Sequence, residues 1–196
     1  CCICFCGEAQ GNGEEKTGVT IMYMEEKMDA GDIISQKEYK ILPTDNVGTL
    51  HEKLSTLGAE LLIETLPSII NETNKRFKQN EDEVTFGYNI KREEEHLDFS
   101  DTGKNIINKI RGLNPFPLAN ILVNEEEYKV LEAYFEEKDA STPKKVREIR
   151  KDAIGIDCQN GTIYLTKIKP FGKKAMNVKD YLNGVKKEEI LKWQIR

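Results

Sequence analysis

The chain has 196 residues and a formal net charge of −5, with 38% hydrophobic and 32% charged residues. These proportions are typical of a soluble globular chain with one large or two small domains, and no apolar run has the length of a transmembrane helix. Residues 1–90 carry 8 basic and 16 acidic side chains, whereas residues 91–196 carry 21 basic and 18 acidic ones. This division predicts two domains with different partners. We expect a cytoplasmic, monomeric protein without a membrane segment.

Four of the five cysteines lie in the first six residues, in the sequence CCICFC. Zinc sites favour CxxC pairs that are complemented by a distant second pair. The spacing here is tighter, and the sequence holds no second cluster, so we predict no metal site. Cys158 lies in a predicted strand and is interpreted as a small core residue.

The first predicted elements surround two aspartates. Residues 19–24 form an apolar run that favours a strand buried on both faces, as in a helix-covered α/β sheet. Asp29 and Asp32 follow, and residues 33–41 favour a second strand. Gly31 permits a tight bend between the two carboxylates. A carboxylate at the mouth of an open α/β sheet lies where such folds place their chemistry. The alternative is that both aspartates are ordinary turn residues.

A long helix is predicted next. Residues 49–52 have the form of a capping box. One apolar stripe at helical spacing follows, formed by Leu50, Leu54, Leu57 and Leu61. Pro67 should kink or restart this helix, and Ile69 and Ile70 are expected to complete its packing face. The polar stretch at residues 71–83 lacks periodicity and is interpreted as an interdomain linker.

The second half alternates short strands and turns. Ser100 is a candidate cap for a helix whose buried stripe contains Ile106, Ile110 and Leu113. Asn160-Gly161 is a strong hairpin signal. Strands are predicted at residues 118–123, 128–135, 146–149, 153–158 and 162–168, and a short final helix at residues 177–184. Short strands with a turn about every ten residues predict a small barrel.

Four stretches of the sequence occur in the order and at the spacing of one enzyme family. They are TGVTIM with MDAGDII in residues 17–34, GTLHEKLSTLGAELL in residues 48–62, KREEEHLDFS with IRGLNPFP in residues 91–117, and FGKKAMNVKDYLNG in residues 171–184. Together they resemble methionyl-tRNA formyltransferases over nearly all of residues 13–185.

This resemblance implies a fold and a reaction. It implies an α/β part followed by a β part: the end of a Rossmann-like catalytic domain in residues 1–72, a linker in residues 73–90, and an OB-like β-barrel that binds tRNA in residues 91–196. It also implies formyl transfer from 10-formyltetrahydrofolate, as co-substrate, to the amino group of initiator methionyl-tRNA. No metal is implied.

The resemblance also assigns residues to this chemistry. Asp29 occupies the position of the family's catalytic aspartate, the first in its D-x-G-D motif, which orients a water or a histidine and raises the basicity of its neighbours. Asp32 is the second aspartate and supports the loop. The residues expected to border the folate are Glu25, Glu26, Lys27, Met28 and Asp32.

The sequence departs from the family pattern upstream of this loop. The family's catalytic Asn and His and its Ser-Leu-Leu-Pro stretch have no counterpart here, because both histidines, His51 and His96, lie downstream. Residues 1–10 do not resemble the family either, as expected for a truncated or frame-shifted gene fragment. We therefore expect little or no activity unless a missing segment is supplied.

Basic side chains gather in the tail. The candidates for RNA contact are Lys144, Lys145, Arg147, Arg150, Lys173 and Lys174. Lysine contacts to phosphate give affinity without sequence information, and the plain alternative is a solvated lysine-rich surface. Phe171 either stacks on a base or packs inward.

Two other functions stay open at this stage. One is a basic module that holds RNA and does no chemistry, and the other is formyl transfer to an amino sugar nucleotide. Sugar formyltransferases and folate-dependent hydrolases share the D-x-G-D region, but their tails differ from FGKKAMNVKDYLNG. The tail therefore favours a tRNA acceptor.

Overall fold

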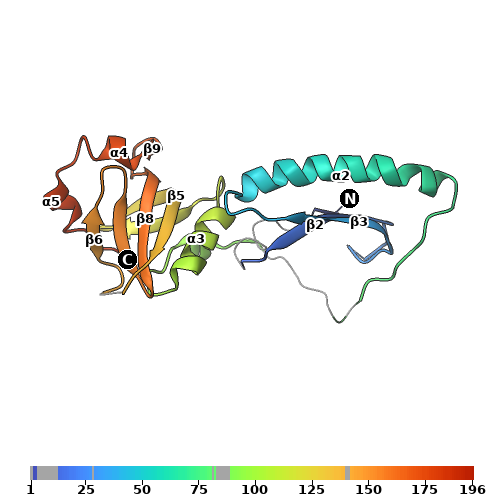
Figure 1. Cartoon of the computed structure of the whole chain (residues 1–196), viewed down its shortest axis with the longest axis horizontal. Helices are drawn as coiled ribbons and strands as arrows, with labels where there is room; N and C mark the ends of the chain where they lie inside the picture. The colour runs from blue at the N-terminus through green and yellow to red at the C-terminus, as the bar shows by residue number, and fades with distance from the viewer. Residues whose placement is uncertain (1, 4–12, 28, 81, 83–88, 140–141) are drawn as a thin grey trace. The chain divides into compact units, whose positions relative to one another are not determined.

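The computed structural model describes residues 2–3, 13–27, 29–80, 82, 89–139 and 142–196. The chain divides into two compact units, whose main parts are Glu14–Asn89 and Ile90–Arg196 (Figure 1). Each unit has its own hydrophobic core. In the part of the chain that the structure describes, no helix has the length and apolarity needed to cross a bilayer.

The N-terminal unit is built on a three-stranded antiparallel sheet in the order β1-β2-β3. Its strands are β1 (Cys2–Ile3), β2 (Lys16–Met22) and β3 (Ile33–Lys40). Val19 and Ile21 of β2 are buried in the core that the sheet forms with helix α2. Thr20 alternates to the opposite face and accepts a hydrogen bond from Gln36 Nε2 at 3.1 Å.

The predicted first strand is too long at its C-terminal end. Met24 lies beyond β2 and is 97% exposed. The ladder with β3 shifts register after Ile21, and the chain leaves the sheet soon afterwards. The expectation of a strand buried on both faces through residue 24 is therefore wrong at this end, because the last residues belong to the loop that carries Asp29.

Helix α2 (Val47–Ile70) covers this sheet (Figure 1). Its cap is Asn46, three residues before the predicted one. Asn46 Oδ1 accepts from the Thr49 N–H at 3.0 Å, and Thr49 Oγ1 accepts from the Asn46 N–H at 3.0 Å. Thr49 thus closes a capping box from inside the helix instead of opening one.

The predicted leucine stripe of α2 is confirmed. Leu50, Leu54 and Leu61 are buried against the sheet, and Leu57 packs partly against them. The end of the helix differs from the prediction. Pro67 lies in the last turn, and α2 continues through it to Ile70, which is 71% exposed. Ile70 therefore does not complete the packing face.

The C-terminal unit begins with the 3₁₀ turn η2 (Arg92–Glu95) and helix α3 (Gly103–Gly112). Thr102, not Ser100, caps α3, since Thr102 Oγ1 accepts from the Asn105 N–H at 3.3 Å. Ile106, Ile110 and Leu113 are buried as predicted. This helix packs on the sheet of the unit (Figure 1).

The sheet of the C-terminal unit is antiparallel, with the strand order β4-β5-β8-β7-β6 and β9 paired to β8. Its strands are β4 (Ala119–Val123), β5 (Glu126–Glu137), β6 (Val146–Ile149), β7 (Ile154–Cys158), β8 (Gly161–Lys169) and β9 (Met176–Asn177). The hairpin predicted at Asn160-Gly161 joins β7 to β8. Among the described residues no pairing joins β4 to β6, the two outer strands of this order. The structure therefore does not show the closed barrel that the sequence predicted.

Two short helices end the chain, α4 (Val178–Tyr181) and α5 (Lys187–Ile190). The first corresponds to the predicted helix at residues 177–184 but is shorter, and the second was not predicted. The C-terminal residues then return to β4, where Leu122 and Arg196 exchange backbone hydrogen bonds of 3.1 Å. This pairing covers the free edge of β4.

Candidate functional site

The Asp29 loop is a tight excursion between β2 and β3. Its two ends are joined by a backbone hydrogen bond of 3.0 Å from the Tyr23 N–H to the Asp32 carbonyl. Asp29 has a φ of 55°, in the left-handed region that few residues other than glycine, asparagine and aspartate adopt. Gly31 is buried, and a Cβ at this position would lie 1.8 Å from the Tyr23 carbonyl oxygen. The loop therefore requires glycine there for space.

The structure brings most of the predicted folate and catalytic residues into this one loop. Glu25, Glu26, Lys27 and Asp29 are exposed, and Asp32 is partly buried where β3 begins. Met28 lies outside the described residues. A backbone hydrogen bond of 3.4 Å from the Ala30 N–H to the Lys27 carbonyl forms the turn that precedes Asp32.

A segment that the sequence presents as linker also contributes to this loop. Gln79 Nε2 donates to the Asp29 carbonyl at 2.7 Å and to the Gly31 carbonyl at 2.8 Å. Phe77 and Ile33 exchange backbone hydrogen bonds of 2.8 and 2.9 Å. The only sequence signal for this contact is Phe77, a single aromatic residue in a polar stretch without periodicity.

Neither histidine lies in the loop. His51 is exposed on α2, and His96 belongs to the C-terminal unit, where its Nδ1 lies 3.1 Å from Asn120 Oδ1. Among the residues that the structure describes, no group of three or more His, Cys, Asp or Glu side chains is arranged to hold a metal ion. The loop offers carboxylates, one ammonium group and backbone groups, from Glu25, Glu26, Lys27, Asp29 and Asp32.

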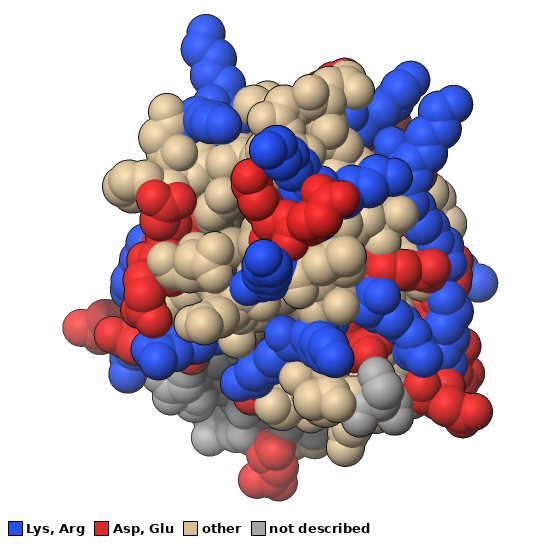
Figure 2. Space-filling model, turned by 90° about the vertical axis from the view of Figure 1, so that its left-hand side faces the viewer, with Lys and Arg blue, Asp and Glu red and all other residues tan. Residues whose placement is uncertain are grey.

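The six basic residues expected at an RNA surface fall into two groups. Lys144, Arg147 and Arg150 have acidic partners, whereas Lys145, Lys173 and Lys174 occupy exposed positions. Lys144 Nζ lies 3.3 Å from Asp98 Oδ1, and Arg147 Nη1 lies 3.2 Å from Asp157 Oδ1. On the face drawn in Figure 2, basic and acidic side chains are interspersed.

Arg150 is the most heavily engaged of these residues. Its guanidinium donates to both carboxylate oxygens of Glu136, at 2.5 and 2.8 Å, and lies 3.7 Å from the centre of the Tyr164 ring. The hydrogen bonds from Arg150 and Lys138 lower the pKa of Glu136 to about 2. Arg150, directly after β6, therefore links the end of that strand to Glu136 of β5 and Tyr164 of β8, as well as carrying charge.

Phe171 is 66% exposed, in the turn between β8 and β9. The neighbouring Gly172 has a φ of 68°, and none of the described residues has an atom within 4 Å of the place that a Cβ would take there. Of the two interpretations of Phe171, inward packing is wrong, because most of this residue is exposed. Lys173 follows, with its Nζ 5.9 Å from the centre of the Tyr181 ring.

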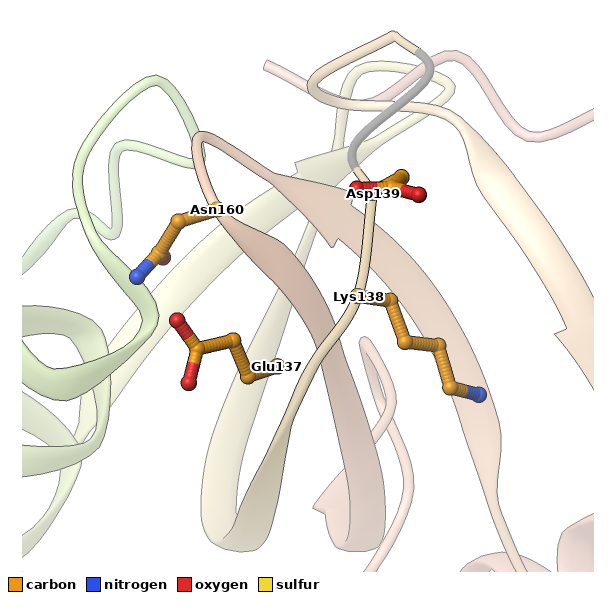
Figure 3. Close-up of a pocket in the computed structure, with 4 residues that line it drawn as sticks. All are labelled: Glu137, Lys138, Asp139 and Asn160. Atoms are coloured by element: carbon orange, nitrogen blue, oxygen red, sulfur yellow. The ribbon is translucent and has the colours of Figure 1, made fainter.

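A pocket of about 570 Å³ lies in the C-terminal unit, whereas Asp29 belongs to the N-terminal unit. Glu137, Lys138, Asp139 and Asn160 line it, and the Lys138 side chain points away from those of Glu137 and Asn160 (Figure 3). Asn160 Oδ1 accepts from the Gly103 N–H at 2.9 Å, and Lys138 Nζ lies 3.0 Å from Glu136 Oε2. These polar groups serve the fold, so we do not assign the chemistry to this pocket.

Two protein-family models match the chain, one in each of its two units. The model of the formyl transferase C-terminal domain matches residues 89–186, and the formyl transferase model matches residues 6–66. The chain belongs to the formyl transferase family. Within this family it is similar to methionyl-tRNA formyltransferases, as the sequence motifs indicated, and that prediction is confirmed.

Two of these relatives give the extent of the likeness. The chain is 46% identical to the methionyl-tRNA formyltransferase of Staphylococcus epidermidis over 180 residues, which cover 91% of this chain and 58% of the relative. It is 45% identical to that of Bacillus subtilis over 174 residues, which cover 88% of this chain and 55% of the relative. The chain thus spans less than three fifths of the length of either relative.

Solved structures share the fold at lower identity. HypX from Aquifex aeolicus, crystallised with tetrahydrofolic acid, has a TM-score of 0.69 and 21% identity, covering 90% of this chain and 31% of HypX. The sugar 3N-formyl transferase WlaRD has a TM-score of 0.60 and 19% identity, covering 87% of this chain and 61% of WlaRD. These likenesses support the formyltransferase fold.

Proposed function

We propose that this chain takes part in transferring a formyl group from 10-formyltetrahydrofolate to the amino group of initiator methionyl-tRNA. One observation carries the proposal: 46% identity to a methionyl-tRNA formyltransferase over 91% of this chain, through both family domains. The proposal includes a cytoplasmic, monomeric enzyme whose tRNA-binding unit, at residues 91–196, is OB-like. This unit follows a catalytic part at residues 1–72 and the segment of residues 73–90, of which residues 74–79 contact the N-terminal unit.

Asp29 is the catalytic residue in this proposal. The acceptor amine must attack the formyl carbon as a neutral nitrogen, and it must then lose a proton. The tetrahedral intermediate releases the folate nitrogen, which takes up a proton as it leaves. A carboxylate at an exposed turn can orient a water molecule for these proton transfers and raise the basicity of a neighbouring group. The exposure of Asp29 in its turn supports this role, because solvent and substrate can reach the side chain.

The folate would lie along the first part of the same loop. Glu25, Glu26 and Lys27 are exposed between β2 and the Asp29 turn, and we assign their backbone groups to the donors and acceptors of a pterin ring. We assign Met28 to the same border and Asp32 to the support of the loop. When bound, the co-substrate supplies the formyl group.

The basic side chains of the C-terminal unit would hold the tRNA. Lys145, Lys173 and Lys174 are exposed and are assigned direct phosphate contacts. Lys144 has an ion pair with Asp98, which offsets part of its charge, and we keep its assignment as an RNA contact beside this pair. We also keep Arg147 and Arg150 as RNA contacts, in addition to their ion pairs with Asp157 and Glu136.

The rate of formyl transfer that we expect of this chain depends on which proton-transfer groups lie in the Asp29 loop. The sequence holds two histidines, and the structure places both outside the Asp29 loop. A missing general acid–base partner costs a factor of roughly 10²–10⁴. We therefore expect little or no formyl transfer by this chain alone, slower by at least about that factor than that of the Staphylococcus epidermidis relative, which serves as the positive control.

The experiment offers this chain 10-formyltetrahydrofolate with three acceptors: initiator methionyl-tRNA, elongator methionyl-tRNA and a nucleotide-linked amino sugar. The proposal predicts formyl-methionyl-tRNA with the initiator acceptor, measured with a sensitivity of at least about 10⁴-fold below the positive control. Formylation of the amino sugar in preference would overturn the acceptor. No product above that limit with any acceptor would overturn the activity and favour a module that only binds RNA.

A further inference from the structure

We infer that Gln79 is a positioning residue for the Asp29 loop, and that the segment of residues 74–79 is a strap that fixes the loop in its working geometry. This inference rests on the proposed function, because it takes Asp29 as the catalytic group. The polar stretch that looks like a linker in the sequence thus has its first residues assigned to the candidate active site.

The geometry at Gln79 is specific. A single amide nitrogen, Nε2, donates to the Asp29 carbonyl at 2.7 Å and to the Gly31 carbonyl at 2.8 Å. A primary amide has two N–H donors on one planar group, which matches two carbonyl oxygens that point to the same side. The two acceptors flank Ala30, so the bonds fix the backbone on both sides of that residue.

The two bonded carbonyls belong to the residues of the loop with the most restricted backbone, Asp29 and Gly31. Asp29 has a φ of 55°, a left-handed conformation that aspartate tolerates better than most residues but that is less favourable than negative φ. Gly31 is confined against the Tyr23 carbonyl. Releasing the Gln79 bonds would let the Asp29 backbone relax toward negative φ, and the carboxylate would move with it.

Three further residues anchor the strap: Asn74, Arg76 and Phe77. Phe77 and Ile33 exchange two backbone hydrogen bonds, of 2.8 and 2.9 Å, at the start of β3. Tyr23 OH donates to Asn74 Oδ1 at 3.1 Å. The Arg76 guanidinium lies 3.9 Å from the centre of the Tyr23 ring. The strap therefore contacts the chain on both sides of the loop, and Gln79 is held at a defined place.

The competing interpretation is that Gln79 only fastens a polar segment to the unit. The two interpretations differ in what a substitution changes. A fastener would alter stability and leave the turnover of the folded protein intact. A positioning residue would lower kcat while leaving the KM for methionyl-tRNA unchanged, because tRNA affinity is assigned to the C-terminal unit.

The test compares Q79E with N80D in the full chain. Q79E keeps the size of the side chain and replaces the NH2 group, which donates both bonds, with a carboxylate oxygen that faces the two carbonyls. N80D makes the same chemical change at the next residue, an exposed position whose Oδ1 accepts from the Asp82 N–H at 3.2 Å. Two readouts are needed: steady-state formyl transfer, and amide hydrogen exchange at Tyr23 and Ala30, whose N–H groups are bonded within the loop.

For Q79E we expect faster exchange at both amides and a fall in kcat of at least about tenfold, toward the factor of about 100 that a misplacement of roughly 1 Å costs. N80D should match the wild type in both readouts. Unchanged exchange in Q79E would refute the strap, and faster exchange with unchanged kcat would refute the positioning role. An inactive wild-type chain would instead refute the proposed function, and the exchange data alone would then decide whether Gln79 holds the loop.

Discussion

Gly31 provides a sharp test of the Asp29 loop, because its requirement is for space. A Cβ there would lie 1.8 Å from the Tyr23 carbonyl oxygen, and that oxygen belongs to backbone that cannot rotate away. In G31A the loop must move, and the hydrogen bond from the Tyr23 N–H to the Asp32 carbonyl is strained or lost. The damage should remain in the N-terminal unit.

The loss in the free energy of unfolding that we expect for G31A combines two costs. Overpacking costs about 1–3 kcal/mol, and a lost backbone hydrogen bond costs roughly 0.5–1.5 kcal/mol. We therefore expect G31A to lower the free energy of unfolding of the N-terminal unit by about 2–4 kcal/mol. The matched control is G172A, at a glycine with a φ of 68° in open space. There only the left-handed backbone penalty of roughly 1–2 kcal/mol applies.

Two spectroscopic probes separate the units in urea unfolding of the full chain. Helix α2, with 24 residues against 10 in α3, dominates the helical circular dichroism and lies in the N-terminal unit. Trp193, the single tryptophan, is buried in the C-terminal unit. G31A should shift the dichroism transition and leave the fluorescence transition in place, and G172A should do the reverse. A dichroism transition in G31A that coincides with the wild type would refute the steric argument.

Three further predictions concern the core, the ion pairs and the basic tail. L54A removes a fully buried side chain under α2 and should cost about 2–5 kcal/mol in the dichroism transition. The pKa of Glu136 falls to about 2 in the folded chain. Its ion pairs should therefore stabilise the C-terminal unit above about pH 4.5 and lose that contribution as the pH falls toward 2. E136Q should flatten this acid dependence of the unfolding transition that Trp193 fluorescence reports. Replacing Lys173 and Lys174 with Ala should weaken the binding of all tRNAs alike and flatten the slope of log K against log salt by roughly one to two units.

Each of these predictions has a control and a contrary result. L62A removes a partly exposed leucine of the same helix, and an equal loss in L62A and L54A would contradict the packing argument. For Glu136, an acid transition that is the same in wild type and E136Q would contradict the pairing with Arg150. For the tail, Lys37 and Lys40 are two lysines of β3 whose replacement should leave tRNA affinity unchanged. An unchanged salt slope in the tail variant would make Lys173 and Lys174 a solvated surface.

The sequence was informative where the determinants are local. The stripe from Leu50 to Leu61 has helical spacing, and a helix buries it on the neighbouring sheet. The hairpin at Asn160-Gly161 is a two-residue signal that needs no tertiary contact. The cap of α2 was misplaced because Thr49 can start a capping box or close one, and only the side chain of Asn46 decides between them.

The candidate site was predictable in part. The D-x-G-D pattern located Asp29, Asp32 and the need for Gly31, since all three lie within one turn. The contacts of Gln79 with that turn were not predictable, because hydrogen bonds between residues so far apart in the sequence leave no periodic trace. The same limit applies to Arg150, which has the pattern of a basic surface residue in the sequence and bonds to Glu136 on strand β5.

The central claim is that Asp29, held in this loop, takes part in formyl transfer to methionyl-tRNA. The most direct measurement is single-turnover formylation of initiator methionyl-tRNA by the wild-type chain and by D29N, with D82N as the control at an exposed aspartate. The account predicts that D29N loses a factor of roughly 10²–10⁴ in rate, with tRNA affinity unchanged, while D82N matches the wild type. Equal rates for D29N and the wild type would contradict the assignment of Asp29 and the function built on it.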